Sequence, residues 1–183
     1  MKKSERRKLI LRSYREEWLR KALEELRPHF EERGYHLPDV VKVFICEGKE
    51  MKMEGKTKVA FHDEADGFFT PEILYPDSGR VIAPKIEIHE WHQRAFEILG
   101  TLTHEMIHAC VTEEEDHHGK EFCHAAFRMG ILPEFSGDGC LAGLEEYLQP
   151  EFYRIADAVT TNLGGFPKMK HVVFEELEGG EKV

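Results

Sequence analysis

The segment His104-Glu105-Met106-Ile107-His108 constrains this chain more than any other feature, because its histidine spacing matches one turn of an α-helix. Residues i and i+4 of a helix lie on the same face, so both imidazoles can reach one metal ion. Apolar residues around the motif recur at helical spacing, which predicts a helix from about His92 to about Glu114. Its expected buried stripe consists of Phe96, Leu99, Leu102, Thr103, Met106 and Ile107.

Glu105 lies about 100° around this helix from His104 and close beside it. Its carboxylate can therefore hydrogen-bond a metal-bound water without binding the metal itself. This arrangement suits metal-assisted hydrolysis, in which the ion lowers the pKa of water toward about 7 and a carboxylate takes the proton. The alternative is two surface histidines on an acidic helix. Clustering favours the metal site, since seven of the eleven histidines lie between His89 and His124.

A catalytic zinc site usually has three protein ligands and one open position. Metzincin proteases have their third histidine six residues after the HExxH motif, but this chain has Glu114 at that position. The third ligand must therefore come from elsewhere in the sequence. Four nearby residues are candidates for it: His117, His118, Glu121 and His124.

We favour His118, because Gly119 permits a tight turn into a third helix and Phe122 can pack the first turn of that helix into the core. The loop then folds back, and His118 faces the open side of the HExxH helix. His117 is expected to point elsewhere as a solvated neighbour. His124 lies one turn into the helix and is expected to be structural or exposed. The predicted Zn2+ ligands are His104, His108 and His118, with Glu105 as the general base.

Other residues are candidates for supporting roles around such a site. Metal-bound histidines usually donate their second N–H to a carboxylate or carbonyl, and several acidic residues nearby could accept it. The alternative is that these acidic residues form a solvated loop. A further donor would stabilise a developing oxyanion. The segment 66–76 is a candidate rim for an extended substrate, and both tryptophans are expected to pack. The candidate partners of the histidines are Glu97, Thr101, Glu113, Glu114, Glu115 and Asp116; the candidate oxyanion donors are His124 and Tyr147; the tryptophans are Trp18 and Trp91.

The N-terminal half of the chain predicts one long helix followed by strands. Helical spacing of apolar residues predicts a helix over about 5–32, broken or kinked near Pro28 and closed by Gly34. Alternating residues predict strands within 40–48 and 80–90, and one or two short strands within 57–79. A turn is expected around residue 55.

The C-terminal half predicts helices, so the order of elements favours an α+β fold. A helix is expected from about Lys120 to Gly130, followed by a turn over residues 135–139. A last helical region is expected from about Cys140, interrupted by Pro150. The polar tail at about 175–183 is expected to be mobile.

The length of 183 residues fits a single domain, residues 1–183. The net charge is −10, yet residues 1–15 carry +6, which leaves −16 for the remainder. An acidic body repels nucleic acid, so a DNA contact would come from the basic arm at residues 2–15. The alternative is that these charges form the solvated face of a helix.

No apolar run approaches the roughly 20 residues that span a bilayer, and the N-terminus lacks the apolar core of a signal peptide. We therefore expect an intracellular, cytoplasmic protein without a membrane partner. The cysteines form no CxxC pair, which argues against a zinc ribbon and favours free thiols. They are Cys46, Cys110, Cys123 and Cys140.

The motifs "HEMIHAC" and "HGKEF" together resemble the two signatures of the SprT-like (Spartan-like) zinc metallopeptidase family. The resemblance is strongest over residues 80–132 and weaker over 6–132. It implies a zincin-like α+β domain, proteolysis of protein substrates and often action on DNA-bound proteins, as in DNA–protein crosslink repair. Many members carry a C-terminal four-cysteine zinc ribbon, whereas this chain has only Cys140 after Gly130. The ligands it implies are His104, His108 and His118, with Glu105 as the base.

Three functions follow, in decreasing order of support. The first is a zinc-dependent metalloendopeptidase, a hydrolase whose substrates include proteins attached to DNA. The second is a non-catalytic, zinc-stabilised DNA or transcription accessory module, in which Glu105 would be dispensable. The third is a metal-dependent hydrolase of another bond class, but the sequence contains no phosphate-binding loop or nucleophile motif that would favour it.

Overall fold

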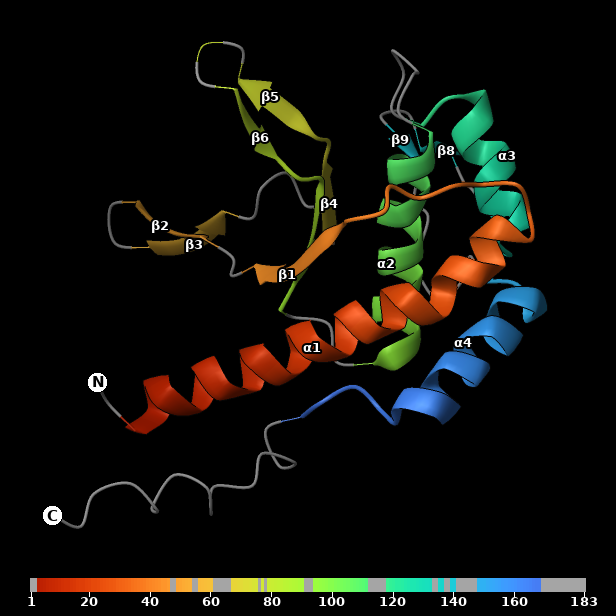
Figure 1. Cartoon of the computed structure of the whole chain (residues 1–183). Coiled ribbons are helices and arrows are strands. Elements are labelled where there is room, and N and C mark those ends of the chain that lie inside the picture. The colour runs from red at the N-terminus through yellow and green to blue at the C-terminus, as the bar shows by residue number, and fades with distance from the viewer. Residues whose placement is uncertain are drawn as a thin grey trace, which may run out of the picture.

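The chain forms an α+β structure of helices and a small sheet, seen in a computed structural model (Figure 1). The structure describes residues 3–46, 49–53, 56–60, 67–75, 77, 79–90, 94–111, 118–132, 135–136, 139–140 and 148–168. Its four described helices are α1 (Lys3–Glu31), α2 (Ala95–Cys110), α3 (Lys120–Arg128) and α4 (Pro150–Leu163). The predicted order of a helix, then strands, then helices is confirmed.

A three-stranded sheet lies against one side of α2, in the order β1-β7-β4. Strand β1 (Lys42–Cys46) is parallel to β7 (Lys85–His89), and β4 (Gly67–Thr70) is antiparallel to β7 at the edge. Val43 and Ile45 of β1 are buried, and so are the residues paired with them in β7. This alternation confirms the predicted strands, because a half-buried sheet buries every second side chain.

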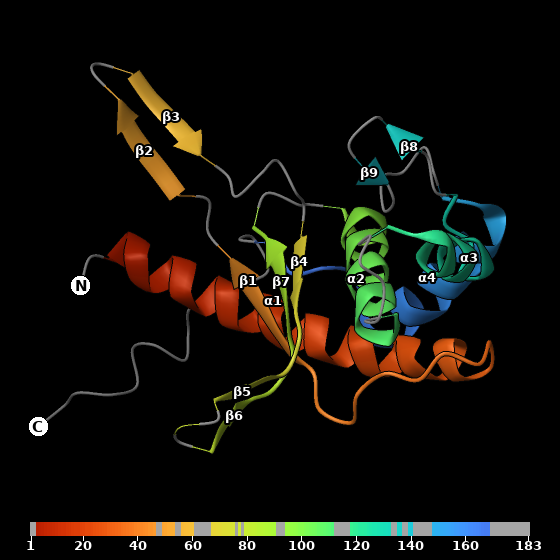
Figure 2. The same cartoon turned by 90° about the horizontal axis from the view of Figure 1, so that it is seen from above.

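Three two-stranded ribbons complete the described strands. The first pairs β2 (Lys49–Met53) with β3 (Lys56–Ala60), and the second pairs β5 (Ile73–Tyr75) with β6 (Arg80–Ile82). The third pairs β8 (Phe135–Ser136) with β9 (Gly139–Cys140). The β2–β3 and β5–β6 ribbons project away from the central sheet in different directions (Figure 2).

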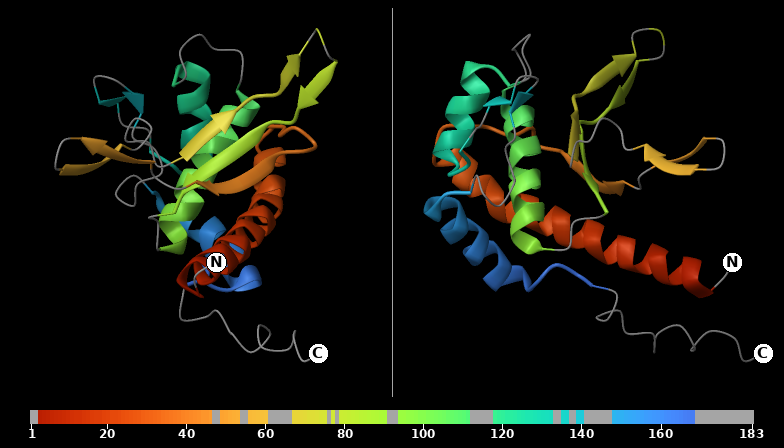
Figure 3. Two further views of the ribbon diagram at one scale, coloured as in Figure 1. Left: turned by 90° about the vertical axis from the view of Figure 1, so that its left-hand side faces the viewer. Right: turned by 180° about the vertical axis from the view of Figure 1, so that it is seen from behind.

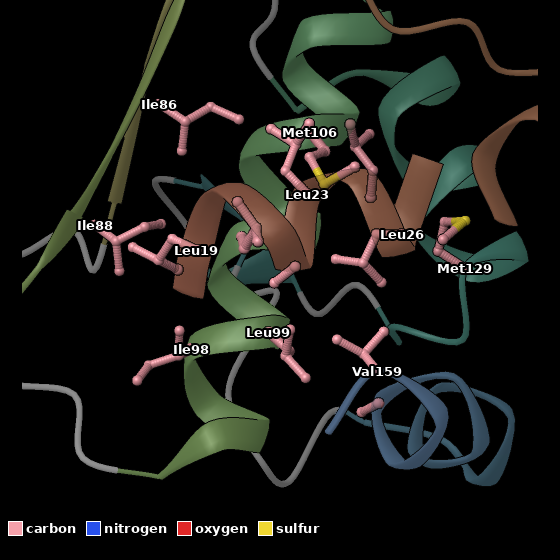
Figure 4. Packing of buried hydrophobic residues seen from close by; sticks show 14 of the residues in the cluster. Leu19, Leu23, Leu26, Ile86, Ile88, Ile98, Leu99, Met106, Met129 and Val159 are labelled. Atoms are coloured by element: carbon pink, nitrogen blue, oxygen red, sulfur yellow. The ribbon is translucent and has the colours of Figure 1, made fainter. Parts of the chain in front are cut away.

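The hydrophobic core lies where α1 crosses α2, with the sheet on one side and α4 on the other (Figures 3 and 4). α2 is enclosed by its neighbours, because every residue from Ile98 to Ile107 is buried. Burying one Leu, Ile or Met side chain contributes roughly 1.5–3 kcal/mol, so this contact dominates the stability of the fold. The side chains that meet here include Leu19, Leu23, Leu26, Ile86, Ile88, Leu99, Met106 and Val159.

The segment that follows α4 is tied to the middle of α1. The indole Nε1 of Trp18 donates to the Gly164 carbonyl at 3.0 Å, and the Trp18 and Phe166 rings meet edge to face. Arg15 is buried and donates to the carbonyls of Pro167 and Glu90, each at 3.1 Å. Trp18 therefore packs in the core, as the sequence predicted.

The ends of two predicted helices are confirmed by their glycines. Gly34 and Gly130 have φ values of 82° and 80°, which favour glycine. The residue after each glycine donates its N–H back to the helix, from Tyr35 to the Phe30 carbonyl and from Ile131 to the Ala126 carbonyl. These bonds satisfy carbonyl groups that have no partner within the helix.

Three helix predictions are corrected. α1 continues through Pro28 to Glu31, since this exposed proline lies in the last turn, so the predicted break is wrong. α2 ends at Cys110 rather than near Glu114, because an acidic run at a helix C-terminus opposes the helix dipole. Pro150 begins α4 instead of interrupting a helix, since proline fits the first helical turn.

The strands outnumber the prediction. The segments on either side of the turn expected around residue 55 pair as the β2–β3 ribbon, which the sequence pattern did not predict. Residues 56–75 contain three strands instead of one or two. Residues 80–90 contain β6 and β7, separated at Pro84. Gly139 and Cys140 lie in β9 rather than at a helix start. These strands have two to five residues, which leaves too little alternation for a sequence pattern to reveal.

Candidate metal centre

Three imidazoles meet where the C-terminal half of α2 faces the start of α3. His104 and His108 come from one face of α2, and His118 lies two residues before α3. Each pair of their Nε2 atoms is 3.2 Å apart, so the three nitrogens form an equilateral triangle. The structure thus brings together the three histidines that the sequence nominated.

A shared metal ion explains this triangle better than hydrogen bonding does. An imidazole Nε2 offers either one N–H or one lone pair, so it cannot serve two neighbouring nitrogens at once. Three nitrogens bound to one tetrahedral zinc at about 2.0–2.1 Å would lie about 3.3–3.4 Å apart. The observed 3.2 Å matches this spacing, and the three residues could hold a metal ion.

The Phe122 ring forms a wall that packs against all three imidazoles. Its centroid lies 4.9 Å from that of His104, 4.5 Å from His108 and 4.7 Å from His118. Phe122 is only 1% exposed, so it holds the rings in place and keeps water from one side of the site. The sequence predicted that Phe122 would pack the first turn of α3 but not that it would contact the ligands.

Gly119 connects His118 to α3 without an unusual backbone. Its φ of −65° and ψ of −170° are open to any residue, so the turn that Gly119 permits does not depend on the conformational freedom of glycine. The loop is held by Cys123, whose Sγ donates to the His118 carbonyl at 3.4 Å and whose N–H donates to the Gly119 carbonyl at 3.0 Å. These bonds fix His118 relative to the helix that follows.

Glu105 lies beside the site and against the edge of the sheet. It is 5% exposed, and it is packed between α2 and β4. A side chain at Gly67 in β4 would approach the Glu105 Cγ to 3.2 Å. Glu105 is therefore carried on the same helix as two of the imidazoles, and its Cγ atom lies close to Gly67 of β4.

The predicted substrate rim contains strands β4 and β5. Strand β4 is the edge strand of the central sheet and packs on α2, and Pro71 and Glu72 separate it from β5. An edge strand offers unpaired backbone groups to an added strand. Gly67 is the first residue of β4. A glycine within a strand can signal a close backbone approach, and that signal was missed.

The remaining candidates have other contacts. Glu97 pairs with Arg94 at 2.7 Å, and the methyl group of Thr101 lies beside Gly67. Glu121 is exposed at the start of α3. His124 is exposed, and its Nδ1 lies 3.2 Å from the Tyr35 hydroxyl, which agrees with the structural role expected for it.

Several candidates lie outside the described residues, so their predicted roles stay predictions. They are His117, expected to be solvated; the acidic residues Glu113, Glu114, Glu115 and Asp116; the candidate oxyanion donor Tyr147; Trp91; and the polar tail at residues 175–183.

Cys46, Cys110 and Cys123 are free thiols, as the sequence predicted. Burial raises the pKa of Cys46 to about 11 and that of Cys110 to about 12. Both thiols therefore stay protonated at neutral pH, which makes them poor nucleophiles. This chemistry favours the histidine cluster over either of these cysteines as the reactive centre.

Comparison of the chain with protein-family models, with curated proteins and with solved structures gave no significant match. None of the described helices combines the length and apolar character that a bilayer crossing requires.

Proposed function

We propose that this protein is a zinc-dependent metalloendopeptidase with a zincin-like domain of the SprT-like type. The observation that carries the proposal is the triangle of Nε2 atoms 3.2 Å apart, with the buried Glu105 on the same helix. His104, His108 and His118 would hold the ion. The "HEMIHAC" and "HGKEF" motifs support the same conclusion through their family resemblance.

When bound, zinc supplies a Lewis acid that polarises the scissile carbonyl and lowers the pKa of water toward about 7. Glu105 acts as the general base that takes a proton from the attacking water. It then returns the proton to the amine that leaves when the peptide bond breaks. Phe122 supports this chemistry by fixing the three rings that it contacts.

The substrate of this enzyme is an extended polypeptide that pairs with β4, the edge strand of the central sheet among the described strands. Backbone hydrogen bonds from an edge strand hold a peptide largely independently of its side chains, which suits an endopeptidase of broad specificity. Packing of β4 on α2 places this edge beside Glu105. The substrate must be locally unfolded to pair in this way.

Proteins bound to DNA are the substrate class that the family resemblance suggests, and the basic residues of the first turns of α1 are the DNA contact we propose. Arg6 and Lys8 are exposed there, and they belong to the region of +6 charge at residues 1–15. Phosphate contacts by such residues would increase the local concentration of DNA-bound substrates. We propose that this activity is cytoplasmic.

The test combines metal analysis with a cleavage assay on wild-type protein and the Glu105→Gln variant. Both should bind one zinc per chain, and the variant should cut an unfolded protein roughly 10²–10⁴-fold more slowly. Glu121→Gln, an exposed change outside the triangle, is the matched control and should cut like wild type. Each assay is run with and without single-stranded DNA, which decides the dependence on DNA.

The alternative is a zinc-stabilised DNA or transcription accessory module without catalysis. Zinc bound by all three proteins, with no cutting under any condition, would favour that module. Equal cutting by wild type and Glu105→Gln would mean that Glu105 is not the base. Loss of zinc from Glu105→Gln would assign this residue to the metal site itself.

A further inference from the structure

Gly67 is the residue at which β4 comes closest to the helix that carries Glu105. A Cβ atom placed there would lie 2.8 Å from the Thr101 Cγ2 atom, 3.1 Å from the Glu87 carbonyl oxygen and 3.2 Å from the Glu105 Cγ atom. Real Cβ atoms essentially never approach another heavy atom to less than 3.0 Å. The lack of a side chain is therefore what allows this approach.

The backbone conformation at position 67 does not itself require glycine. The glycines with positive φ among the described residues are elsewhere, at positions 34, 79, 130 and 164. Glycine also adds entropy to the unfolded chain and packs no side chain, so it is not favoured for its own sake at this first residue of β4. Space is thus the physical reason for glycine here.

Neither neighbour can move aside easily. Thr101 is 4% exposed, and a β-branched side chain on a helix has few rotamers open to it. Gly67 is paired with Ile88 of the central strand, so β4 is held from its other side. A methyl group at position 67 would therefore push β4 and α2 apart or displace Glu105.

We infer that Gly67 is a positioning residue that sets the distance between the substrate edge of β4 and the Glu105 carboxylate. This inference rests on the proposed function, and it names the structural element that delivers the scissile bond to the base. A peptide paired with β4 inherits the position of that strand. A displacement of a few tenths of an ångström changes the reacting distance. The three imidazoles keep their positions relative to one another, because α2 and the start of α3 carry them and β4 does not.

The test uses Gly67→Ala, Thr101→Ser and the double variant Gly67→Ala/Thr101→Ser, compared with wild type. Thr101→Ser removes the Cγ2 atom that clashes at 2.8 Å and leaves the contact with Glu105 at 3.2 Å. Gly67→Ala alone should lower the thermal midpoint of unfolding. The double variant should recover most of this loss, because the added methyl group occupies the space of the deleted one.

In the double variant, whose stability is largely restored, kcat on an unfolded protein substrate should be about tenfold lower than in wild type. KM should change less, and one zinc per chain should be retained. A purely structural role for Gly67 would instead restore kcat together with stability. A double variant with wild-type kcat therefore overturns the positioning role and leaves the proposed function standing. The positioning role would also be overturned if the midpoint change of the double variant equalled the sum of the two single changes, since that would show that positions 67 and 101 do not touch.

The proposed function fails in a different way. Zinc-loaded wild-type protein that cuts no substrate would overturn both the peptidase and the catalytic role of Gly67. The coupling between positions 67 and 101 in thermal unfolding would still report whether β4 approaches α2 this closely.

Discussion

Two regions of the molecule are each rich in one kind of functional side chain. The C-terminal half of α2 carries histidines of the candidate metal centre, and the first turns of α1 carry basic residues. At α2, His104 and His108 meet His118 from another element, with their nitrogens 3.2 Å apart. Along α1, the basic residues spread over several turns that extend beyond the other helices (Figures 1 and 3). Both regions are clusters of one residue type in the sequence, but only the histidines converge on one point in space.

The basic residues of α1 divide into structural and exposed ones. Arg12 pairs with Glu16 at 3.1 Å, and Glu16 also accepts the Ile45 N–H. Arg15 is 6% exposed, and its guanidinium donates hydrogen bonds to two backbone carbonyls. Arg6 and Lys8 are exposed.

This comparison teaches that a cluster of residue types in the sequence becomes a site only where packing aims the side chains at one point. Enclosure of α2 and the Phe122 wall do this for the histidines. An exposed helix leaves its charges apart in solvent, where each acts through the field of the whole surface. Three variants, each with a control, test the contrast.

The largest effect is expected at the metal centre. His118→Ala should weaken zinc binding by more than about 100-fold, beyond the 10–100-fold typical of changes around a site, because it removes a ligand. His124→Ala is the matched control, since it removes an exposed imidazole six residues away that contacts Tyr35. Competition with a chromogenic chelator measures both affinities. Equal zinc loss from both variants would mean that the triangle does not bind zinc as a unit.

A smaller effect is expected from Arg15→Ala. This change leaves the Glu90 and Pro167 carbonyls without their buried donor, and such a loss costs about 1–3 kcal/mol per group. The free energy of unfolding in urea should therefore fall by about 3 kcal/mol. Arg20→Ala, which removes an exposed guanidinium 3.5 Å from Glu17, should leave the unfolding midpoint unchanged. A stable Arg15→Ala protein would instead assign Arg15 to the basic surface that we propose as a DNA contact.

The smallest effect on stability is expected from Arg6→Gln combined with Lys8→Gln. Both side chains are exposed, so the unfolding midpoint and zinc binding should not change. If these residues contact phosphate, affinity for single-stranded DNA falls, and the slope of log K against log salt decreases by about 0.7 per lost contact. DNA binding equal to that of wild type at every salt concentration would show that this part of α1 is only a solvated helix face.

The sequence by itself determined the features that depend on neighbouring residues. Helical periodicity placed His104 and His108 on one face of a helix, with Glu105 beside them. Glycines marked the ends of α1 and α3, because only a local conformation is needed to end a helix. The HGxxF spacing nominated His118 through its short distance from a helix start.

Only the tertiary structure decided how distant segments meet. The Phe122 wall, the edge position of β4 and the approach of Gly67 to Thr101 and Glu105 join residues from separate elements. Short strands carry too few alternating residues to reveal their partners or their register. Such contacts depend on the packing of the whole core, in which a gap of a few tenths of an ångström separates a tolerated side chain from an excluded one.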